Sequence, residues 1–174
     1  MKVVFNDGGR EAAGFKGHAG DCVTRAIAIA AELPYTEVYK KIALGNVSQR
    51  AGKRGKRTRS ANHGVETDRK WFKDYMRSLG FVWTPTMGIG TGCKVHLHDG
   101  ELPDGRLVVM VSKHACAVID GVIHDTHDPQ RDGVTFERPP GWETMPLKLG
   151  YSRNQNGIHH VSRRCVYGYW KKVD

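Results

Sequence analysis

The stretch GDCVTRAIAIA, residues 20–30, places a cysteine at the first turn of a small-residue, apolar helix. Asp21 is a suitable N-cap, and the glycines before it allow the chain to turn into the helix. The unpaired backbone N–H groups of a first helical turn favour thiolate over thiol, so Cys22 is placed for nucleophilic chemistry. The rest of the chain must then supply a base for this thiol.

Three helices are expected in the first half of the chain. The first covers about residues 21–33, where Pro34 ends it, and the second covers about residues 36–45. A third is expected over residues 67–80, because apolar residues recur there at helical spacing. Its apolar stripe, which is expected in the core, consists of Trp71, Phe72, Tyr75, Met76 and Leu79.

The second half of the chain is rich in strand patterns, and a short strand is also expected at residues 3–5. The later strands are predicted at residues 81–83, 106–112, 114–119, 122–126 and 165–170. Prolines at positions 129, 139, 140 and 146 break up the region before the last strand. Helices in the first half and strands in the second predict an α+β fold.

The length and the charge of the chain limit its organisation and its partners. Its 174 residues fit a single domain over residues 1–174 with a sizeable core. A net charge of +9 and a pI of about 9.5 indicate attraction to nucleic acid, an acidic protein surface or anionic lipid. Much of this charge lies in a predicted flexible basic loop at about 48–63, which has no apolar period. Its cationic residues are Arg50, Lys53, Arg54, Lys56, Arg57 and Arg59.

The four cysteines, Cys22, Cys93, Cys116 and Cys165, are widely separated in the sequence. They form no CxxC pair and no dense disulfide framework, which favours reduced thiols in a cytosol. The N-terminus opens into polar sequence, and no apolar run approaches the length of a membrane span. These features predict a cytoplasmic protein that does not enter membranes, and they are compatible with a bacterial or phage origin.

The clearest hairpin joins two neighbouring strands through the turn Asp120-Gly121. Counting back from a two-residue turn places Cys116 opposite Asp125. Two residues further from the turn, His114 lies opposite His127. His114 and Asp125 are then diagonal neighbours on one face, close enough for the carboxylate to orient the imidazole.

Cys22, His114 and Asp125 together supply a nucleophile, a base and an acceptor that orients the base. Each also has an ordinary structural interpretation, as a buried free cysteine, a core histidine and a turn acceptor. His127 and Asp128 replace Asp125 as the orienting group if the strand pairing slips. The order and spacing favour the triad, which needs no cofactor and no metal.

A cysteine, a histidine and an acid in this order, on a helix start and two neighbouring strands, resemble the papain-like cysteine peptidase superfamily. The segments that carry the resemblance are GDCVTRAIAIA, SKHACAVIDG and VIHDT. The resemblance implies a papain-like fold, in which N-terminal helices pack on a C-terminal antiparallel sheet or half-barrel. It also implies a cysteine hydrolase, a peptidase or isopeptidase, that acts on a protein or peptide through an acyl-thioester at Cys22. Amidases, deamidases and acyltransferases use the same triad, so the reaction stays open at this point.

The oxyanion hole departs from the pattern of this superfamily. Many members carry a glutamine donor six residues before the cysteine, where this chain has Lys16. The backbone N–H of Cys22 remains a natural donor. The side chains of Asn6, Lys16 or His18, in the glycine-rich loop before the helix, are candidates for the second donor.

Two other kinds of site are open from the sequence. Thiolate and imidazole ligands for zinc are offered by Cys93, His96, His98, His159, His160 and Cys165, although their spacing is not that of a standard finger. The basic run favours a second function class, a nucleic-acid-binding or adaptor protein on a papain-like scaffold whose site is inactive. The run lacks interleaved aromatic residues for base stacking.

Overall fold

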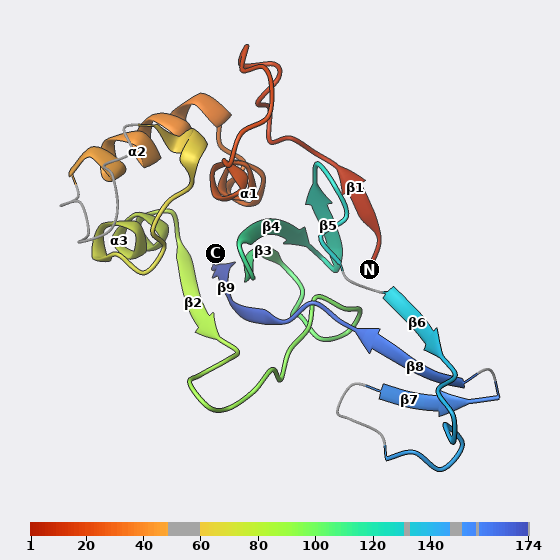
Figure 1. Ribbon diagram of the computed structural model, residues 1–174. Coiled ribbons are helices and arrows are strands. Elements are labelled where there is room, and N and C mark those ends of the chain that lie inside the picture. Colours follow the sequence, from red (N-terminus) through yellow and green to blue (C-terminus); the bar gives the residue numbers. More distant parts are fainter. Residues whose placement is uncertain (49–59, 131–132, 147–150, 156, 174) are drawn as a thin grey trace.

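The computed structural model describes residues 1–48, 60–130, 133–146, 151–155 and 157–173, and it confirms the α+β class (Figure 1). The helices are α1 (Cys22–Ala31), α2 (Tyr35–Ser48) and α3 (Lys70–Ser78), with a short 3₁₀ helix, η1 (Ala61–His63). The main sheet consists of β1 (Val3–Phe5), β2 (Phe81–Pro85), β3 (Arg106–Val111), β4 (His114–Ile119), β5 (Val122–Asp125) and β9 (Val166–Lys172). A second sheet consists of β6 (Gly133–Glu137), β7 (Tyr151–Asn154) and β8 (Gly157–Ser162).

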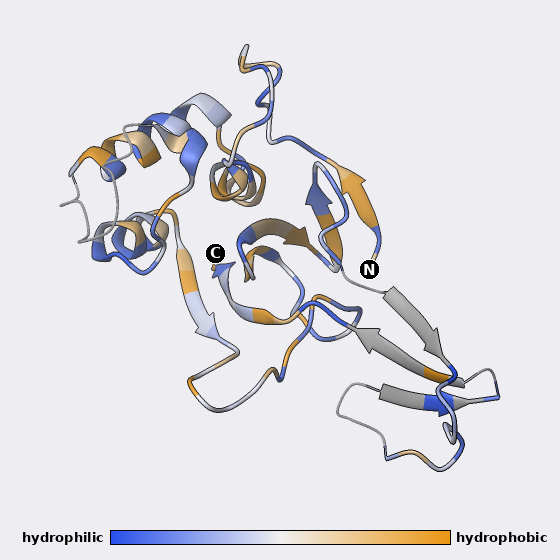
Figure 2. Cartoon of the chain, viewed as in Figure 1, coloured by the Kyte–Doolittle hydropathy of each residue, from blue (hydrophilic) through white to orange (hydrophobic). Residues whose placement is uncertain are grey.

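Helix α1 lies against the main sheet and is buried along most of its length. Ala26, Ile27 and Ala30 are at most 2% exposed and belong to the same core cluster as Ala115 and Ala117 of β4. Both elements are mostly hydrophobic in Figure 2. Small side chains on both surfaces allow close approach of helix and strand. This packing fixes the start of α1 relative to β4.

The predicted helices are confirmed, with shifted ends. Helix α1 stops before Glu32, which adopts a left-handed φ of 55° and donates its N–H to the carbonyls of Ala28 and Ile29. Helix α2 continues past the predicted end to Ser48, whereas α3 is shorter than predicted at both ends. The predicted apolar stripe of α3 lies in the core or packs against it.

The strand order in the main sheet is β1-β5-β4-β3-β9-β2. Strands β5, β4, β3, β9 and β2 pair antiparallel, but β1 pairs parallel with β5. The sheet is therefore mixed, and the expectation of a purely antiparallel sheet is wrong in this respect. The reason is that the N-terminal strand adds to the edge of a sheet otherwise built from later segments, and no hairpin turn connects β1 to β5.

The hairpin of β4 and β5 has the predicted register, with Ile119 paired to Val122. Both turn residues have positive φ, 46° at Asp120 and 75° at Gly121, as a two-residue hairpin turn of the favoured twist requires. The strand pairing does not slip, so the condition under which His127 or Asp128 would replace Asp125 is not met.

The second sheet, in the order β6-β8-β7, was not expected from the sequence. The prolines taken as breakers lie in the connection between β6 and β7 or before β6, outside the strands themselves. Proline is excluded from ladder positions but not from the loops between them. The region therefore forms strands in spite of its proline content.

The basic run at residues 50–59 lies outside the described residues. At the end of the predicted basic loop, η1 begins after Ser60, whose Oγ accepts a hydrogen bond from the N–H of Asn62 at 3.0 Å. Among the described residues, none of the helices combines the length and apolar character that a bilayer crossing needs.

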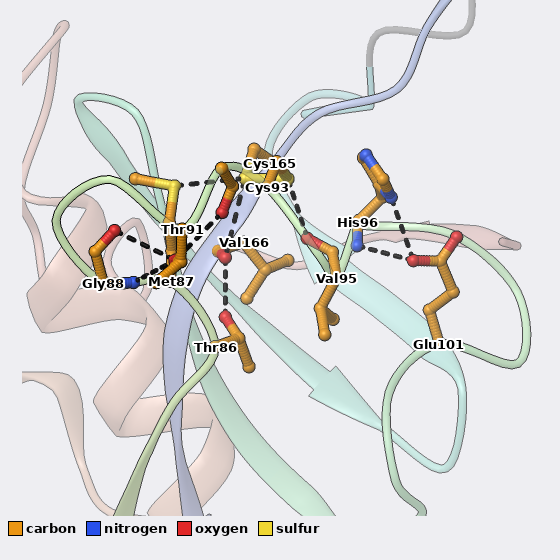
Figure 3. The surroundings of a disulfide bond; sticks show 11 residues. Thr86, Met87, Gly88, Thr91, Cys93, Val95, His96, Glu101, Cys165 and Val166 are labelled. Carbon is orange, nitrogen blue, oxygen red and sulfur yellow. Dashed lines mark hydrogen bonds and ion pairs between the residues drawn. A yellow bond between two sulfur atoms is a disulfide. The ribbon is translucent and has the colours of Figure 1, made fainter. Parts of the chain in front are cut away.

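A disulfide joins Cys93 to Cys165, with their Cα atoms 5.8 Å apart (Figure 3). This finding corrects the prediction of reduced thiols at these two positions. An isolated antiparallel bridge between His96 and Cys165 lays the loop before β3 beside the start of β9. That pairing brings together two cysteines separated by 72 positions. Cys22 and Cys116 are free cysteines.

Loss of this disulfide should destabilise the protein. A crosslink that closes a long loop restricts the unfolded chain, and its removal typically costs about 2–4 kcal/mol. We expect Cys165→Ser to lower the free energy of unfolding by this amount in urea titrations, and reductant to lower the wild-type value similarly. In the double variant Cys93→Ser/Cys165→Ser, reductant should have no further effect. A wild-type transition that does not respond to reductant contradicts the bond.

Candidate active site

Cys22 is the first residue of α1, and its half-buried side chain lines a cleft of about 1490 Å³. His114 is the first residue of β4, and Asp125 is the last residue of β5. The three residues come from separate elements that meet because α1 packs across the sheet at β4. The structure thus brings the three predicted catalytic residues to one place.

A hydrogen bond connects His114 to Asp125. The Nε2 of His114 lies 2.5 Å from the Oδ2 of Asp125, whose carboxylate is 5% exposed. The second oxygen of Asp125 accepts the backbone N–H of Thr126 at 2.7 Å. Because a carboxylate only accepts hydrogen bonds, Nε2 carries the proton and Nδ1 is the ring nitrogen left for Cys22. Asp125 therefore orients His114, as the hairpin register predicted.

The thiol and the imidazole shift each other's ionisation. Burial raises the pKa of Cys22, but the hydrogen bond and charge of His114, together with the N–H of Ala115 and the charge of Arg25, bring the pKa below its ordinary value. Burial lowers the pKa of His114, but hydrogen bonds to Asp125 and Cys22 outweigh it and raise the pKa to about 9. Both shifts favour a thiolate–imidazolium pair.

Asp21 stands at the N-cap position of α1 but makes no side-chain capping hydrogen bond, so its predicted capping role is wrong. Its carboxylate, whose side chain is 1% exposed, lies 2.9 Å from Arg10 Nε and 3.1 Å from Arg25 Nε. It also accepts a hydrogen bond of 2.5 Å from the hydroxyl of Tyr35. Two guanidinium groups and a phenol compete successfully with the helix N–H groups for this carboxylate. Asp21 is the buried centre of two ion pairs and directly precedes Cys22 in the chain.

The two arginines connect this centre to both flanks of the site. Arg10 also donates to the carbonyls of Phe15 and Lys16 at 3.1 and 3.2 Å, which fixes the loop before Cys22. Arg25 donates to the hydroxyl of Thr126 at 2.5 Å, beside Asp125. Neither arginine was expected at the site from the sequence. The spacing of four between Asp21 and Arg25 was a visible signal, whereas nothing in the sequence places Arg10.

The walls of the cleft differ on the two sides of His114. Toward β3, β9 and β2, the lining includes Met110, Trp83, Tyr167 and Trp170. Toward β5 and β1, it includes Phe5, Asp7, Thr126 and His127. The cleft therefore has an aromatic wall on one side of His114, and on the other side a wall of polar residues and one exposed phenylalanine.

The candidate oxyanion donors differ in position. Lys16 and His18 line the cleft with exposed side chains, and the carbonyl of Lys16 accepts from Arg10. Asn6 does not belong to the lining. Its Oδ1 accepts the N–H of Gly8 at 2.9 Å, and its Nδ2 lies 3.5 Å from Nδ1 of His124. Asn6 is therefore removed from the set of donors.

A second thiol lies close to the site but is inactive in its environment. Cys116 is 1% exposed, and burial followed by the charge of Asp125 raises its pKa above the ordinary value. A buried protonated thiol is a poor nucleophile. Cys116 therefore serves as an internal comparison for the reactivity of Cys22.

Among the described residues, one group offers three possible metal ligands at this site. The ligand atoms of His114, Asp125 and His127 lie within 4.8 Å of one another, and the rings of His114 and His127 are 4.8 Å apart. The His114–Asp125 separation of 2.5 Å is that of a hydrogen bond. A zinc ion with ligands at about 2.0–2.2 Å would hold these two atoms roughly 3 Å apart or more. The observed geometry thus fits a proton better than a metal.

The zinc site considered from the sequence is not supported. Cys93 and Cys165 are joined to each other and offer no thiolate. The Nδ1 of His96 lies 3.0 Å from Oε2 of Glu101, as Figure 3 shows. The Nδ1 of His98 contacts a backbone carbonyl. The side chains of residues 159 and 160 lie outside the described part of the chain.

Replacing Asp125 with asparagine should change the titration of His114. The carboxylate stabilises the imidazolium, so its loss lowers the His114 pKa from about 9 toward neutrality. NMR of the His114 ring should show the lower midpoint in Asp125→Asn. Asp128→Asn, an exposed neighbour, should leave it unchanged. An equal or higher midpoint in Asp125→Asn contradicts the role of this carboxylate.

Comparison with known proteins identifies no relative of this chain. No protein-family model, no curated protein and no solved structure matches it significantly. A functional proposal therefore rests on the geometry and chemistry of the site.

Proposed function

We propose that this protein is a papain-like cysteine hydrolase, a peptidase or isopeptidase that acts through Cys22, His114 and Asp125. One observation carries the proposal. At the wall of a large cleft, the thiol of Cys22 interacts with the imidazole of His114, which is hydrogen-bonded to the buried carboxylate of Asp125. The lowered pKa of Cys22 and the raised pKa of His114 are the shifts that an activated thiol requires.

The reaction proceeds in two stages. The Cys22 thiolate attacks the substrate carbonyl, and a C–S bond forms as the carbonyl oxygen becomes an oxyanion. His114 donates the proton on Nδ1 to the leaving amine as the C–N bond breaks, which leaves an acyl-thioester. Water then attacks the thioester and gives a proton to His114. The C–S bond breaks, the acid is released and the thiolate–imidazolium pair is restored.

The reaction that follows acylation depends on what the cleft admits. Water as the acceptor gives hydrolysis, and an amine acceptor gives acyl transfer from the same intermediate. A cleft of about 1490 Å³ that is open to solvent suits a protein or peptide chain better than a small amide. The net charge of +9 favours acidic substrates.

A peptide library tests the proposed activity. The protein and its Cys22→Ala variant are incubated with peptides derived from a digested proteome, and new termini are identified by mass spectrometry. We expect cleavage products with the wild type that are absent with Cys22→Ala. Products that persist in the variant, or the absence of any product with the wild type, contradict the peptidase assignment.

A further inference from the structure

The side-chain amide of Asn62, on η1, makes no hydrogen bond within the described part of the chain. Its Oδ1 is buried without a partner, and no contact of its Nδ2 with a polar group is found among those residues. An amide oxygen that is buried without a hydrogen-bond partner destabilises the folded state. Such groups are rare in folded proteins, and here the Nδ2 donors of the same amide are also uncommitted among the described residues.

Asn62 lies directly against the turn that leads into the nucleophile. Its carbonyl accepts the N–H of Gly20 at 2.7 Å, two residues before Cys22. A Cβ atom on Gly20 would lie 3.1 Å from that carbonyl oxygen, so the two backbones are in close contact. Asn62 and Cys22 also line the same cleft.

The backbone of η1 is held in place from both ends. Asn46 of α2, which is 8% exposed, donates to the carbonyls of Ser60 and Gly64 at 3.3 and 3.1 Å. The Oγ of Ser60 accepts from the Asn62 N–H and lies 3.0 Å from the hydroxyl of Tyr39. Within the described ranges, Asn62 thus carries an unpaired side-chain amide on an anchored backbone, in the cleft that Cys22 also lines.

The chemistry of the proposed reaction requires such a group. Attack on a carbonyl produces an oxyanion, and donors fixed in advance stabilise it at little reorganisation cost. The N–H of Cys22, at the first turn of α1, supplies one donor. We propose that Nδ2 of Asn62 supplies the second, which makes Asn62 a catalytic residue of the hydrolase proposed above and rests on that function.

Asn62 fits this role better than the side chains of the preceding loop. Lys16 and His18 have exposed side chains, whereas the side chain of Asn62 is half-buried. An exposed lysine side chain loses more conformational entropy when it is fixed than the shorter Asn62 side chain, which is half-buried on an anchored backbone. In this protein Asn62 of η1 thus supplies the oxyanion donor that members of the superfamily carry in the loop before the cysteine.

Two reactions of Cys22, carried out with the whole 174-residue chain, distinguish an Asn62 that donates to the oxyanion from an Asn62 that only supports the fold. Iodoacetamide alkylates the thiolate by displacement of iodide, and no oxyanion forms. p-Nitrophenyl acetate transfers its acetyl group to Cys22 through a tetrahedral oxyanion and releases p-nitrophenolate. Asn62→Leu preserves much of the side-chain volume and removes the amide. Asn62→Ala serves as a second variant.

We expect Asn62→Leu and Asn62→Ala to slow acetylation of Cys22 by about 10²-fold, the usual effect of losing one oxyanion donor. Alkylation should change by less than about 3-fold, because its transition state needs no such donor. Lys16→Ala should slow acetylation less than either variant. The midpoint of thermal unfolding should not fall in Asn62→Leu, because the unpaired amide contributes no internal hydrogen bond.

Each of the remaining outcomes contradicts either the donor role of Asn62 or the proposed hydrolase activity. Acetylation at the wild-type rate in both Asn62 variants, or a larger loss in Lys16→Ala, removes Asn62 as the donor and leaves the hydrolase intact. An equal loss of acetylation and alkylation assigns Asn62 a structural role. A wild type that is alkylated but never acetylated at Cys22 overturns the proposed hydrolase, and the donor role with it.

Discussion

Replacing His114 with alanine is expected to slow alkylation of Cys22 by iodoacetamide at pH 7 by about 10-fold or more. Burial alone raises the pKa of Cys22, and His114 is the main group that lowers it. Without the imidazole, the thiolate fraction at neutral pH falls to about 1% or less. Hydrolysis should fall further, by at least about 10³-fold, because His114 also transfers protons in both stages of the proposed reaction.

The free thiol of Cys116 provides the control for this experiment. Its reactivity should be low in the wild type and unchanged in His114→Ala, since its raised pKa results first from burial. A rise in Cys116 labelling would report partial unfolding instead of loss of the base. Equal alkylation rates of Cys22 in the wild type and in folded His114→Ala contradict an activated thiol.

Replacing Asp21 with asparagine should lower the free energy of unfolding by about 3–5 kcal/mol, because two largely buried arginines lose the buried counter-ion that they share. The side chains of Arg10 and Arg25 are only 13% and 14% exposed, so water compensates them poorly. Urea denaturation measures the effect. The loop before Cys22 should also loosen, because Arg10 loses the anchor from which it holds two loop carbonyls.

Tyr35→Phe is the matched control for Asp21. It removes one hydrogen bond to the same carboxylate and leaves both ion pairs in place, so the expected cost is smaller, about 1.5–3 kcal/mol. A free energy of unfolding that falls no more in Asp21→Asn than in Tyr35→Phe would show that the ion pairs add little.

Local patterns predicted the parts of the site that lie on regular elements. The turn Asp120-Gly121 sets the hairpin register, and this register alone places His114 beside Asp125. The apolar, small-residue sequence after Cys22 predicts a buried helix, and its packing on β4 brings the thiol to the imidazole. The spacing of apolar residues and the residue types of a turn depend only on neighbouring positions in the chain. They can therefore be recognised in the sequence before the fold is known.

The parts that were missed depend on contacts between distant segments. Asp21 has the residue type and position of an N-cap, but Arg10 and Tyr35 reach it through loop and helix placements that no local pattern encodes. Asn62 follows a run of basic residues and carries no motif. The disulfide between Cys93 and Cys165 depends on a pairing between two loops.

The most direct test of the central claim is to trap the acyl-thioester on Cys22. The wild-type protein is mixed with p-nitrophenyl acetate at neutral pH, quenched in acid within the first turnover, digested and analysed by mass spectrometry. The account predicts one acetyl group on the peptide that carries Cys22, absent in Cys22→Ala and lost on treatment with hydroxylamine. An unmodified Cys22 peptide, or acetylation only at lysines or Cys116, would contradict it.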